Sequence, residues 1–374
     1  MMYLDHAATA PVRREVLEAM WPYLTGEFGN PSSVHELGLS AASALTWARE
    51  TVAALLNARA SEIIFTSGGT EADNLGVKGI ALGSPRGRHI VTTAIEHSAV
   101  LASCDYLARF HGFEISIVGV DADGLVDVEE IAASIRDDTT LVAVMYANNE
   151  VGTVQPIERI TELASARRVP IHVDAVHAAG WLPLDTRALG STSLALSGHK
   201  IGAPKGTGAL AVRAGVAIEP TMHGGGQERG RRSGTESVAG AVGFATALEL
   251  AERDRVDAAV RIAAVRDRFI DRVLARVPGA TLTGHRERRV PASASFTFAE
   301  VSGESLLVEL ERRDILCSSG AACAAGRDEP SPVLLAMGLS EDTARTALRF
   351  SLSASVTDAQ LDTVTDALVD LCSS

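Results

Sequence analysis

The segment SGHKIGAPKG (197–206) holds Lys200 and Lys205, two of the three lysines in the chain. Almost every other cation is an arginine, and an arginine cannot lose a proton to act as an amine nucleophile. A lysine kept between a histidine and a glycine-rich turn therefore indicates amine chemistry on a carbonyl group. We assign that chemistry to Lys200 and interpret Lys205, in a Pro-Lys-Gly turn, as a solvated turn cation.

Other polar residues follow predicted strands and could serve the same chemistry. The Gly-Gly turn of TSGGTEADN (66–74) precedes a helix that is expected to open at Thr70, where free backbone N–H groups suit a phosphate, although a plain turn has the same sequence. His97 and Asn149 follow two further strands, and Asp174 ends a third. A carboxylate at a strand end beside an asparagine is what a heteroaromatic ring nitrogen requires.

His172, Asp174 and His177 could also be metal ligands. Alternation along a strand points His172 and Asp174 to the same side but sends His177 beyond the strand end, which disfavours a metal site. An amine, a carboxylate for a pyridine nitrogen and donors for a phosphate together predict pyridoxal 5′-phosphate (PLP), bound to Lys200 as a Schiff base.

These groups converge only if strands and helices alternate along the chain. Between residues 62 and 213, short β-branched runs alternate with helical patterns, which predicts a doubly wound α/β fold with a largely parallel sheet and a ligand at the carboxyl ends of its strands. We expect strands in EIIFTS, RHIVTTA, FEISIVGV, TTLVAVMYA, PIHVDAV, SLALS and GALAVR. We expect helices in TEADNLGVKGIAL, SAVLASCDYLARF, VDVEEIAASI and PIERITELASARR.

The pattern changes after Gly240 and indicates a smaller α+β domain. Its expected elements are a long helix VDAAVRIAAVRDRFIDRVLARV, a strand SASFTF, a helix SLLVELERR, the segment ILCSSGAACAAG, a strand TALRFSLS and a last helix. We therefore predict a large domain over residues 15–250. Residues 1–14 and 251–374 would form the small domain, with a cysteine-bearing loop at about 317–330.

The composition excludes some partners. The 374-residue chain has a formal net charge of −13, whereas nucleic-acid binding needs clustered basic side chains, so no direct nucleic-acid contact is expected. No apolar run approaches a membrane span, and the start of the chain lacks the order of a signal peptide. We expect a soluble, cytoplasmic protein with no membrane partner. Its four cysteines follow no disulfide framework.

The motifs, taken in order, resemble those of cysteine desulfurases of the NifS/IscS type, which are fold-type I PLP enzymes of the class V aminotransferase family. The matching stretches span nearly the whole chain: YLDHAAT, FGNPSSVH, IIFTSGGTEADN, EHSAV, NNEVG, HVDAV, SGHK, HGGGQERGRRSGT, GESLLVEL, CSSGAAC and RFSLS. The resemblance implies a large domain with a mainly parallel seven-stranded sheet flanked by helices. It also implies removal of sulfur from L-cysteine to give L-alanine and a protein persulfide.

The resemblance further implies roles for individual residues. Lys200 would hold the cofactor and move the α-proton, Asp174 would pair with the ring nitrogen, and His97 would stack on the ring and carry protons. Other residues would contact the cofactor or the substrate: Gly69, Thr70, Asn149, His177, Ser197, His199, Arg349 at the substrate carboxylate, and Thr235 from the neighbouring subunit of a homodimer.

Cys323, in SSGAACAAG, matches the nucleophile of the family, whose thiolate takes the sulfur atom. Cys317 is its rival, but it ends the apolar run ILC and is predicted in a strand, whereas Cys323 lies among small residues in a loop. The chain departs from the family at His177, where many relatives have glutamine, so a pH-dependent charge is expected there. The cysteine loop also lacks two hydroxyl side chains, which predicts weaker thiol activation.

Three functions fit these observations. The leading one is a desulfurase that passes persulfide sulfur to an acceptor protein for iron–sulfur cluster assembly, or for tRNA, cofactor or DNA thiolation. Selenocysteine lyase or another class V PLP lyase is the first alternative. A docking protein with a decayed site is the second, and it is disfavoured because every role needed for the chemistry is filled.

Overall fold

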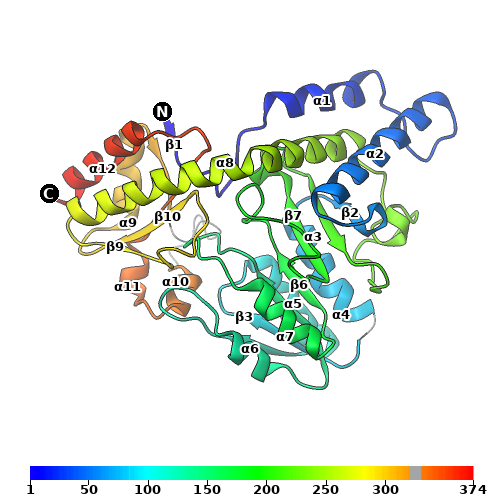
Figure 1. Ribbon diagram of the computed structural model, residues 1–374, viewed down its shortest axis with the longest axis horizontal. Helices are drawn as coiled ribbons and strands as arrows, with labels where there is room; N and C mark the ends of the chain where they lie inside the picture. Colours follow the sequence, from blue (N-terminus) through cyan, green and yellow to red (C-terminus); the bar gives the residue numbers. More distant parts are fainter. Residues whose placement is uncertain (84, 320–329, 374) are drawn as a thin grey trace.

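The computed structural model describes residues 1–83, 85–319 and 330–373. Two groups of elements lie side by side, and one long helix, α8 (Val238–Arg276), runs along both (Figure 1). The larger group is built on a seven-stranded sheet and the smaller on a four-stranded sheet. Among the described residues, no helix is long and apolar enough to cross a membrane.

All seven strands expected between residues 62 and 213 form, and they make one mainly parallel sheet of order β2-β8-β7-β6-β5-β3-β4. In this sheet β8 runs antiparallel to both of its neighbours. The strands are β2 (Ile63–Thr66), β3 (His89–Thr93), β4 (Glu114–Val118), β5 (Thr139–Met145), β6 (Ile171–Asp174), β7 (Ser193–Ser197) and β8 (Gly208–Val212).

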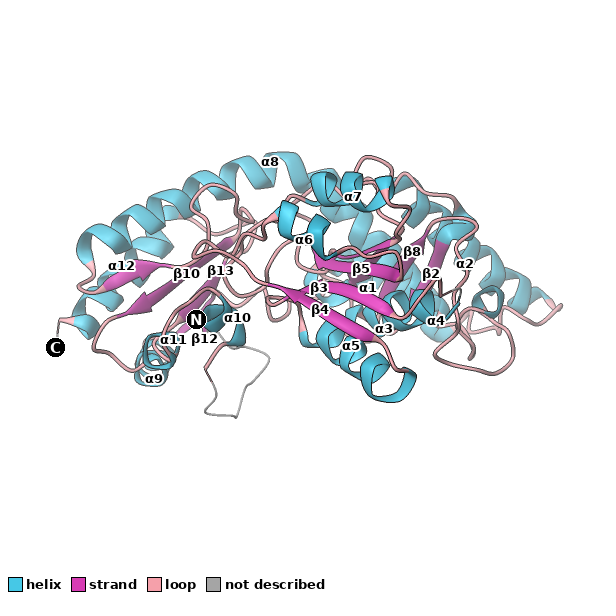
Figure 2. Cartoon of the chain, turned by 90° about the horizontal axis from the view of Figure 1, so that it is seen from below, coloured by secondary structure: helices cyan, strands magenta, loops and turns pink. Residues whose placement is uncertain are grey.

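Helices cover both faces of this sheet (Figure 2). All residues of β5 are buried, and alternate side chains point to opposite faces. Leu141 and Ala143 share a core cluster with residues of α4 (Ile80–Gly83) and α5 (Ser98–His111), whereas Val142 and Val144 belong to the cluster of α6 (Val128–Ser134) and α7 (Ile157–Ala166). Burial on both faces explains the continuous apolar run that predicted this strand.

The single helix expected over residues 70–82 is instead three pieces: α3 (Gly69–Asn74), a π-helical turn over Leu75–Gly79, and α4. Gly76, in the wider turn, explains the difference. A Cβ on Gly76 would lie 2.3 Å from two atoms of the His172 ring. The turn and the glycine together make room for a buried imidazole behind the sheet edge.

The four-stranded sheet has the order β12-β13-β10-β9 and is antiparallel. Phe269 of α8 packs edge-on against Phe296 and Phe350 of this sheet. A separate parallel pair joins β1 to β11. The strands are β1 (Met2–Tyr3), β9 (Ala280–Leu282), β10 (Ser293–Phe298), β11 (Ile315–Leu316), β12 (Ser318–Ser319) and β13 (Leu348–Ser351); the helices are α9 (Gly303–Arg312), α10 (Pro332–Ala336), α11 (Glu341–Ala344) and α12 (Asp358–Cys372).

Helix α8 begins at Val238, well before the start expected near Val256, and α1 (Arg14–Thr25) and α2 (Glu36–Leu55) pack against it. The helix is therefore continuous through residue 250, where the domain division was expected. That division remains a prediction, since one rigid helix contributes to both groups of elements.

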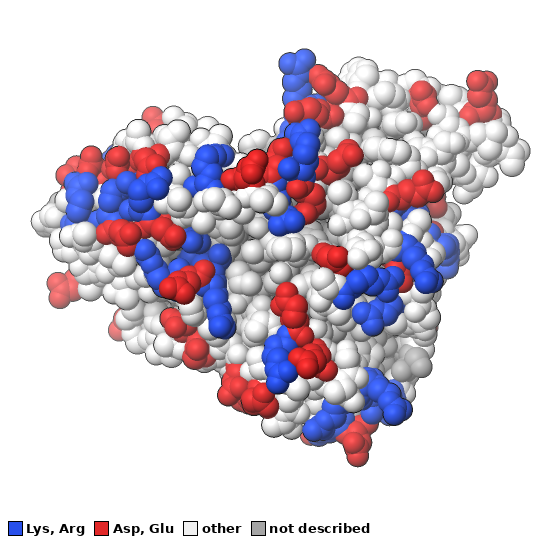
Figure 3. All heavy atoms as spheres, viewed as in Figure 1, with Lys and Arg blue, Asp and Glu red and all other residues white. Residues whose placement is uncertain are grey.

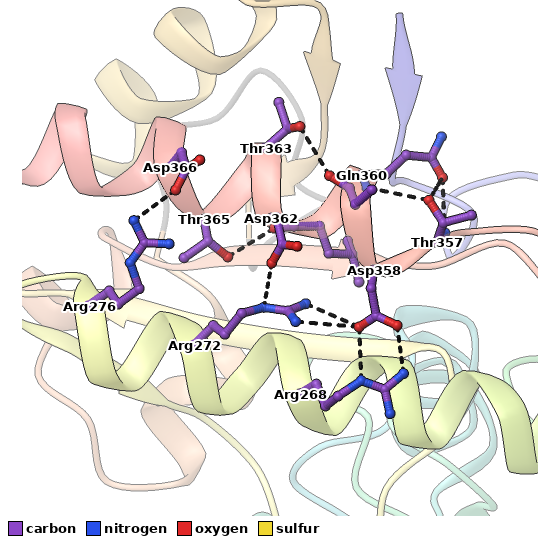
Figure 4. A network of polar contacts seen from close by, with 12 residues as sticks. Arg268, Arg272, Arg276, Thr357, Asp358, Gln360, Asp362, Thr363, Thr365 and Asp366 are labelled. Carbon is purple, nitrogen blue, oxygen red and sulfur yellow. Dashed lines mark hydrogen bonds and ion pairs between the residues drawn. The ribbon is translucent and has the colours of Figure 1, made fainter.

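An ion-pair ladder ties α8 to the C-terminal helix α12 (Figure 4). Arginines and aspartates recur at four-residue intervals on the facing sides of the two helices. The pairs are Arg268–Asp358, Arg272–Asp358, Arg272–Asp362 and Arg276–Asp366. Figure 3 shows the same mixture of signs on the surface of this part of the molecule, where acidic and basic side chains are interspersed.

Candidate active site

A cavity of about 560 Å³ lies at the carboxyl ends of the large sheet and reaches β13 of the small sheet. It is the place where the predicted site residues meet, because parallel strands end at one edge. Ten predicted residues line it: Gly69, Thr70, His97, Asn149, Asp174, His177, Ser197, His199, Lys200 and Arg349. Thr235 lines a separate depression instead, and the predicted Cys323 lies outside the described residues.

One end of the cavity is formed by the turn of Gly68 and Gly69, called the glycine cradle below. Gly68 has φ +150°, a region that suits glycine, and α3 begins directly after it. A Cβ on Gly69 would lie 2.7 Å from Cγ2 of Val176 and 3.3 Å from Cβ of Ser197. The absence of a side chain lets Val176 and Ser197 pack directly against the turn that leads into α3, whose first backbone N–H groups can bind an anion.

Glu71 of α3 also lines the cavity. Its carboxylate accepts a hydrogen bond from the backbone N–H of Ser67 at 2.8 Å and pairs with Nε of Arg232 at 2.8 Å. Burial opposes ionisation, but these contacts outweigh burial and hold the pKa of Glu71 below its usual range. Glu71 is therefore an anion at the cavity wall, and its charge is balanced by Arg232.

Asp174 ends β6 with its carboxylate at the cavity, and its Oδ1 accepts a hydrogen bond from the backbone N–H of Val176 at 2.9 Å. A second buried carboxyl, Asp73, lies 3.2 Å from Nε2 of His172. Burial, followed by the charge of Asp174, raises the pKa of Asp73 well above its usual value. Burial also raises the pKa of Asp174, but His97 and Lys200 oppose this shift. Asp174 is thus the carboxyl of the pair that holds the negative charge.

His97 is the N-cap of α5, and its Nδ1 accepts a hydrogen bond from the backbone N–H of Ala99 at 3.1 Å. That contact leaves Nε2 as the ring nitrogen able to carry a proton into the cavity. The preceding Glu96 is buried, which raises its pKa to about 8 despite hydrogen bonds from Thr93 and the backbone of Met145. Glu96 therefore stays protonated at neutral pH.

Lys200 lies in the 3₁₀ turn that follows β7. Its Nζ donates to the carbonyl oxygen of Ala8 at 2.9 Å and also to that of Ala7. The neighbouring His199 contacts Oγ1 of Thr9 through Nδ1 at 3.2 Å. Burial, reinforced by Lys200 and Lys205, lowers the pKa of His199 to about 4, so its ring is neutral.

These partners belong to the N-terminal segment Asp5–Ala10, which sequence patterns did not connect to the site. Its Ala7, Ala8 and Thr9 line the cavity, and its contacts with Lys200 run through backbone carbonyls. A carbonyl has no residue type, so no motif could mark it. The available signal was the position of the segment in YLDHAAT, a stretch noted only for its resemblance to the family.

Arg349 of β13 is 1% exposed and completes the far wall of the cavity. Its Nη1 donates to the carbonyl oxygen of Asn149 at 2.8 Å, and its Nη2 donates to Oδ1 of Asp5 at 2.7 Å. The turn that carries Asn149 is held from a second side by Glu150, which accepts a hydrogen bond from Ser331. Burial raises the pKa of Glu150 to about 7. Asp5 and Glu150 do not line the cavity, but Asp5 contacts and Glu150 adjoins a residue that does, and the motifs predicted neither.

His177 lines the cavity, and its Nε2 is buried without a hydrogen-bond partner among the described residues. Burial, with added repulsion from Arg349 and Lys200, lowers its pKa to about 3. The charge at this position was expected to respond to pH. The structure changes that expectation, because a ring with so low a pKa is neutral throughout the physiological range.

The described cysteine that competes for the nucleophile role is Cys317. It lies between β11 and β12, where burial, followed by the charge of Asp5, raises its pKa to about 12. A thiol with that pKa supplies almost no thiolate at neutral pH, so Cys317 is a poor nucleophile. This supports the choice against Cys317.

Two further expectations concern residues at the rim. Lys205 is exposed, as expected for a turn cation, but it also lines the cavity. Thr235 lines a depression that shares Ser67 and Gly206 with the cavity. Within one chain Thr235 is therefore close to the cradle but not part of it.

Comparison with known proteins gives a consistent result. The model of the aminotransferase class-V family matches residues 2–364. The chain is 44% identical over 371 residues to the cysteine desulfurase IscS of Methanosarcina thermophila, which covers 99% of this chain and 91% of that relative. Among solved structures, a NifS-like protein matches with a TM-score of 0.92 and 37% identity over 100% of this chain and 99% of its own. SspA in complex with cysteine matches with a TM-score of 0.83 and 35% identity, over 94% and 99%.

Proposed function

The chain belongs to the aminotransferase class-V family, and on this premise we propose that it is a PLP-dependent cysteine desulfurase. The observation that carries the proposal is the meeting of Lys200, Asp174 and Arg349 in one cavity. An amine, a carboxylate and a guanidinium are the groups that this cofactor and an amino-acid substrate require. The relatives favour L-cysteine as the substrate and do not favour the selenocysteine lyase alternative.

The cavity residues fit the cofactor. Asp174 would pair with the pyridine nitrogen, and the turn at residues 68–70 would hold the phosphate with Ser197 and His199; all of these residues line the cavity. The buried Nε2 of His177 has no partner among the described side chains, so as an N–H donor it suits the ring oxygen. When bound, PLP draws electrons away from the substrate carbon that carries the amine.

The side chains divide the remaining tasks. Arg349 binds the substrate carboxylate with the guanidinium donors that Asn149 and Asp5 do not occupy. Lys200 is the amine that would hold the cofactor, and as a free amine it would take the α-proton of the substrate. His97 would lie against the ring and would carry protons through Nε2, and Asn149 would orient the ring oxygen or the substrate.

The sulfur step belongs to Cys323. Its thiolate attacks the sulfur of the bound L-cysteine, so that an S–S bond forms while the C–S bond breaks. The electron pair of the broken bond stays on the carbon, which then takes up a proton. L-Cysteine and one protein thiol thus give L-alanine and one protein persulfide, and the step balances without an external oxidant or reductant.

The assembly follows from the same proposal. We place the chain in a homodimer in which Thr235 of one subunit completes the phosphate site of the other, because Thr235 lies at the rim but outside its own cavity. The small domain of residues 1–14 and 251–374 would carry the persulfide to an acceptor protein in the cytoplasm. Iron–sulfur cluster assembly is the recipient pathway that the IscS relatives favour.

The test is to incubate the purified protein with L-cysteine and a thiol reductant and to measure sulfide and L-alanine. We expect equimolar products, abolished by Cys323→Ala and retained by Cys317→Ala. PLP binding without alanine formation would refute the desulfurase assignment. Full activity of Cys323→Ala would refute the choice of nucleophile.

A further inference from the structure

Arg349 is a buried cation that depends on a partner far away in the sequence. Its guanidinium is 1% exposed, so water cannot satisfy it. The one carboxylate paired with it among the described residues is Asp5, whose Oδ1 lies 2.7 Å from Nη2. The opposite nitrogen, Nη1, donates to the carbonyl oxygen of Asn149 at 2.8 Å, and Nε has no partner in the described part of the chain.

Asp5 is itself fixed by the strand that carries Arg349. Ser351 of β13 donates its backbone N–H to the carbonyl oxygen of Leu4 at 2.8 Å, and its Oγ accepts from the backbone N–H of Ala7 at 2.8 Å. The hydroxyl of Tyr3 donates to the carbonyl oxygen of Asp5 at 3.0 Å. The backbone on both sides of Asp5 is thus attached to β13, two residues from Arg349.

Two anchors on different nitrogens fix the plane of a guanidinium, because its five N–H groups have a rigid fork geometry. With Asn149 on one side and Asp5 on the other, the remaining N–H groups of Arg349 keep one orientation at the cavity wall. Removing Asp5 would leave the buried cation with one hydrogen-bond anchor and without its one ion-pair partner among the described residues.

We propose that Asp5 is a positioning residue for substrate binding: it orients Arg349 so that the guanidinium meets the α-carboxylate of the amino acid. The inference rests on the proposed function for the identity of the substrate. Asp5 acts through Arg349 and does not contact the substrate. Asp5 therefore affects how tightly the carboxylate is bound rather than the rate of the chemistry.

The experiment compares Asp5→Ala and Asp5→Asn in the PLP-loaded protein. Equilibrium binding of L-alanine, followed by the change in cofactor absorbance, reports carboxylate binding without sulfur transfer. We expect Asp5→Ala to weaken L-alanine binding and raise KM for L-cysteine at least about tenfold, with kcat changed by less than about threefold, as for the loss of one partner of a buried charge pair. Asp5→Asn keeps an oxygen acceptor for Nη2 and should restore binding to within about threefold of the wild type.

Two comparisons separate positioning from a general loss of structure. Asp254→Ala removes the carboxylate that pairs with Arg13 at 3.3 Å, so it loosens the nearby chain without touching Arg349; L-alanine binding should stay unchanged. In an Arg349→Ala background, Asp5→Ala should weaken L-alanine binding no further, because a residue that acts through Arg349 has nothing left to position.

Unchanged L-alanine binding in Asp5→Ala would overturn the inference, as would a further loss in the Arg349→Ala background or equal losses in Asp5→Asn and Asp5→Ala. These results are distinct from a failure of the proposed function. If the wild-type protein binds L-alanine but releases no sulfide from L-cysteine, the desulfurase proposal is wrong, while the binding series still decides the role of Asp5.

Discussion

The seven-stranded sheet and the N-terminal segment contribute different kinds of groups to the same cavity. The sheet supplies side chains such as Asp174 and Lys200, each placed where a strand ends. The segment supplies the carbonyl oxygens of Ala7 and Ala8 and one carboxylate, Asp5, from a stretch without a long strand or helix. Groups that react with a ligand are therefore marked by residue type, whereas the groups that hold them in place are mostly backbone.

The largest effect on activity is expected at Lys200, which follows β7 of the large sheet. Lys200→Arg keeps a cation that can donate to Ala7 and Ala8, but a guanidinium cannot bind the cofactor covalently. Sulfide release should fall by at least about 1,000-fold, with loss of the protein-bound cofactor absorbance. The matched control is Lys205→Arg, an exposed rim lysine, which should stay near wild type. Equal losses in both variants would remove the special role of Lys200.

The glycine cradle gives the next largest effect. Gly69→Ala places a Cβ 2.7 Å from Cγ2 of Val176, and such overpacking costs about 1–3 kcal/mol. We expect lower unfolding free energy in urea and weaker PLP binding. Gly26→Ala is the control, because a Cβ there meets nothing within 4 Å. If PLP affinity were unchanged in Gly69→Ala, the cradle would not be the phosphate site.

The raised pKa of Glu96 predicts that the free energy of unfolding depends on pH. Its pKa is raised from 4.5 to about 8 in the folded protein, so between these values the folded state binds the proton that the unfolded state has lost. Stability should therefore fall as pH rises through this window, by up to about 1.4 kcal/mol per pH unit. Glu96→Gln should remove this part of the slope in unfolding titrations of the cofactor-free protein. A slope identical to wild type would show that Glu96 is ionised.

A smaller effect is expected in the N-terminal segment. The Tyr3 hydroxyl lies 3.0 Å from the carbonyl oxygen of Asp5 and 2.8 Å from that of Thr9. Tyr3→Phe should cost about 1 kcal/mol of unfolding free energy and raise KM for L-cysteine by less than about threefold, because the contacts with β13 remain. A large fall in kcat would mean that Tyr3 also affects the contacts between the segment and Lys200, and would contradict a role limited to substrate binding.

The ladder between α8 and α12 should matter least to the site. Arg272 and Asp362 lie 2.9 Å apart but are partly exposed, so Asp362→Asn should cost less than about 1 kcal/mol. The loss should shrink in high salt, as screening predicts. KM and kcat should be unchanged in steady-state assays; a change in either would mean that α12 is coupled to the cavity.

The strands of the large sheet, and the cavity residues that follow them, could be predicted from the sequence for a physical reason. Strands buried on both faces, such as β5, are continuous apolar runs, and parallel strands bring the residues that follow them to one edge. His97, Asn149, Asp174 and Lys200 could therefore be placed together before the structure was known. The start of α8 was misjudged because residues 238–251 are mostly buried and rich in small side chains, and so lack a polar face.

The contacts of the N-terminal segment could not be predicted in this way. Asp5 and Arg349 are separated by 344 positions, and no local pattern couples them. The pKa of His177 was also out of reach, because burial and the nearby cations Arg349 and Lys200 lower it, and both depend on the fold.

The most direct test of the account is the intact mass of the protein after a single turnover with L-cysteine and no reductant, followed by peptide mapping. We predict the gain of one sulfur atom on the peptide that contains Cys323, with one L-alanine released per sulfur bound, and no gain in Lys200→Arg. Sulfur bound to Cys317 instead, or L-alanine formed without any gain in protein mass, would contradict the account.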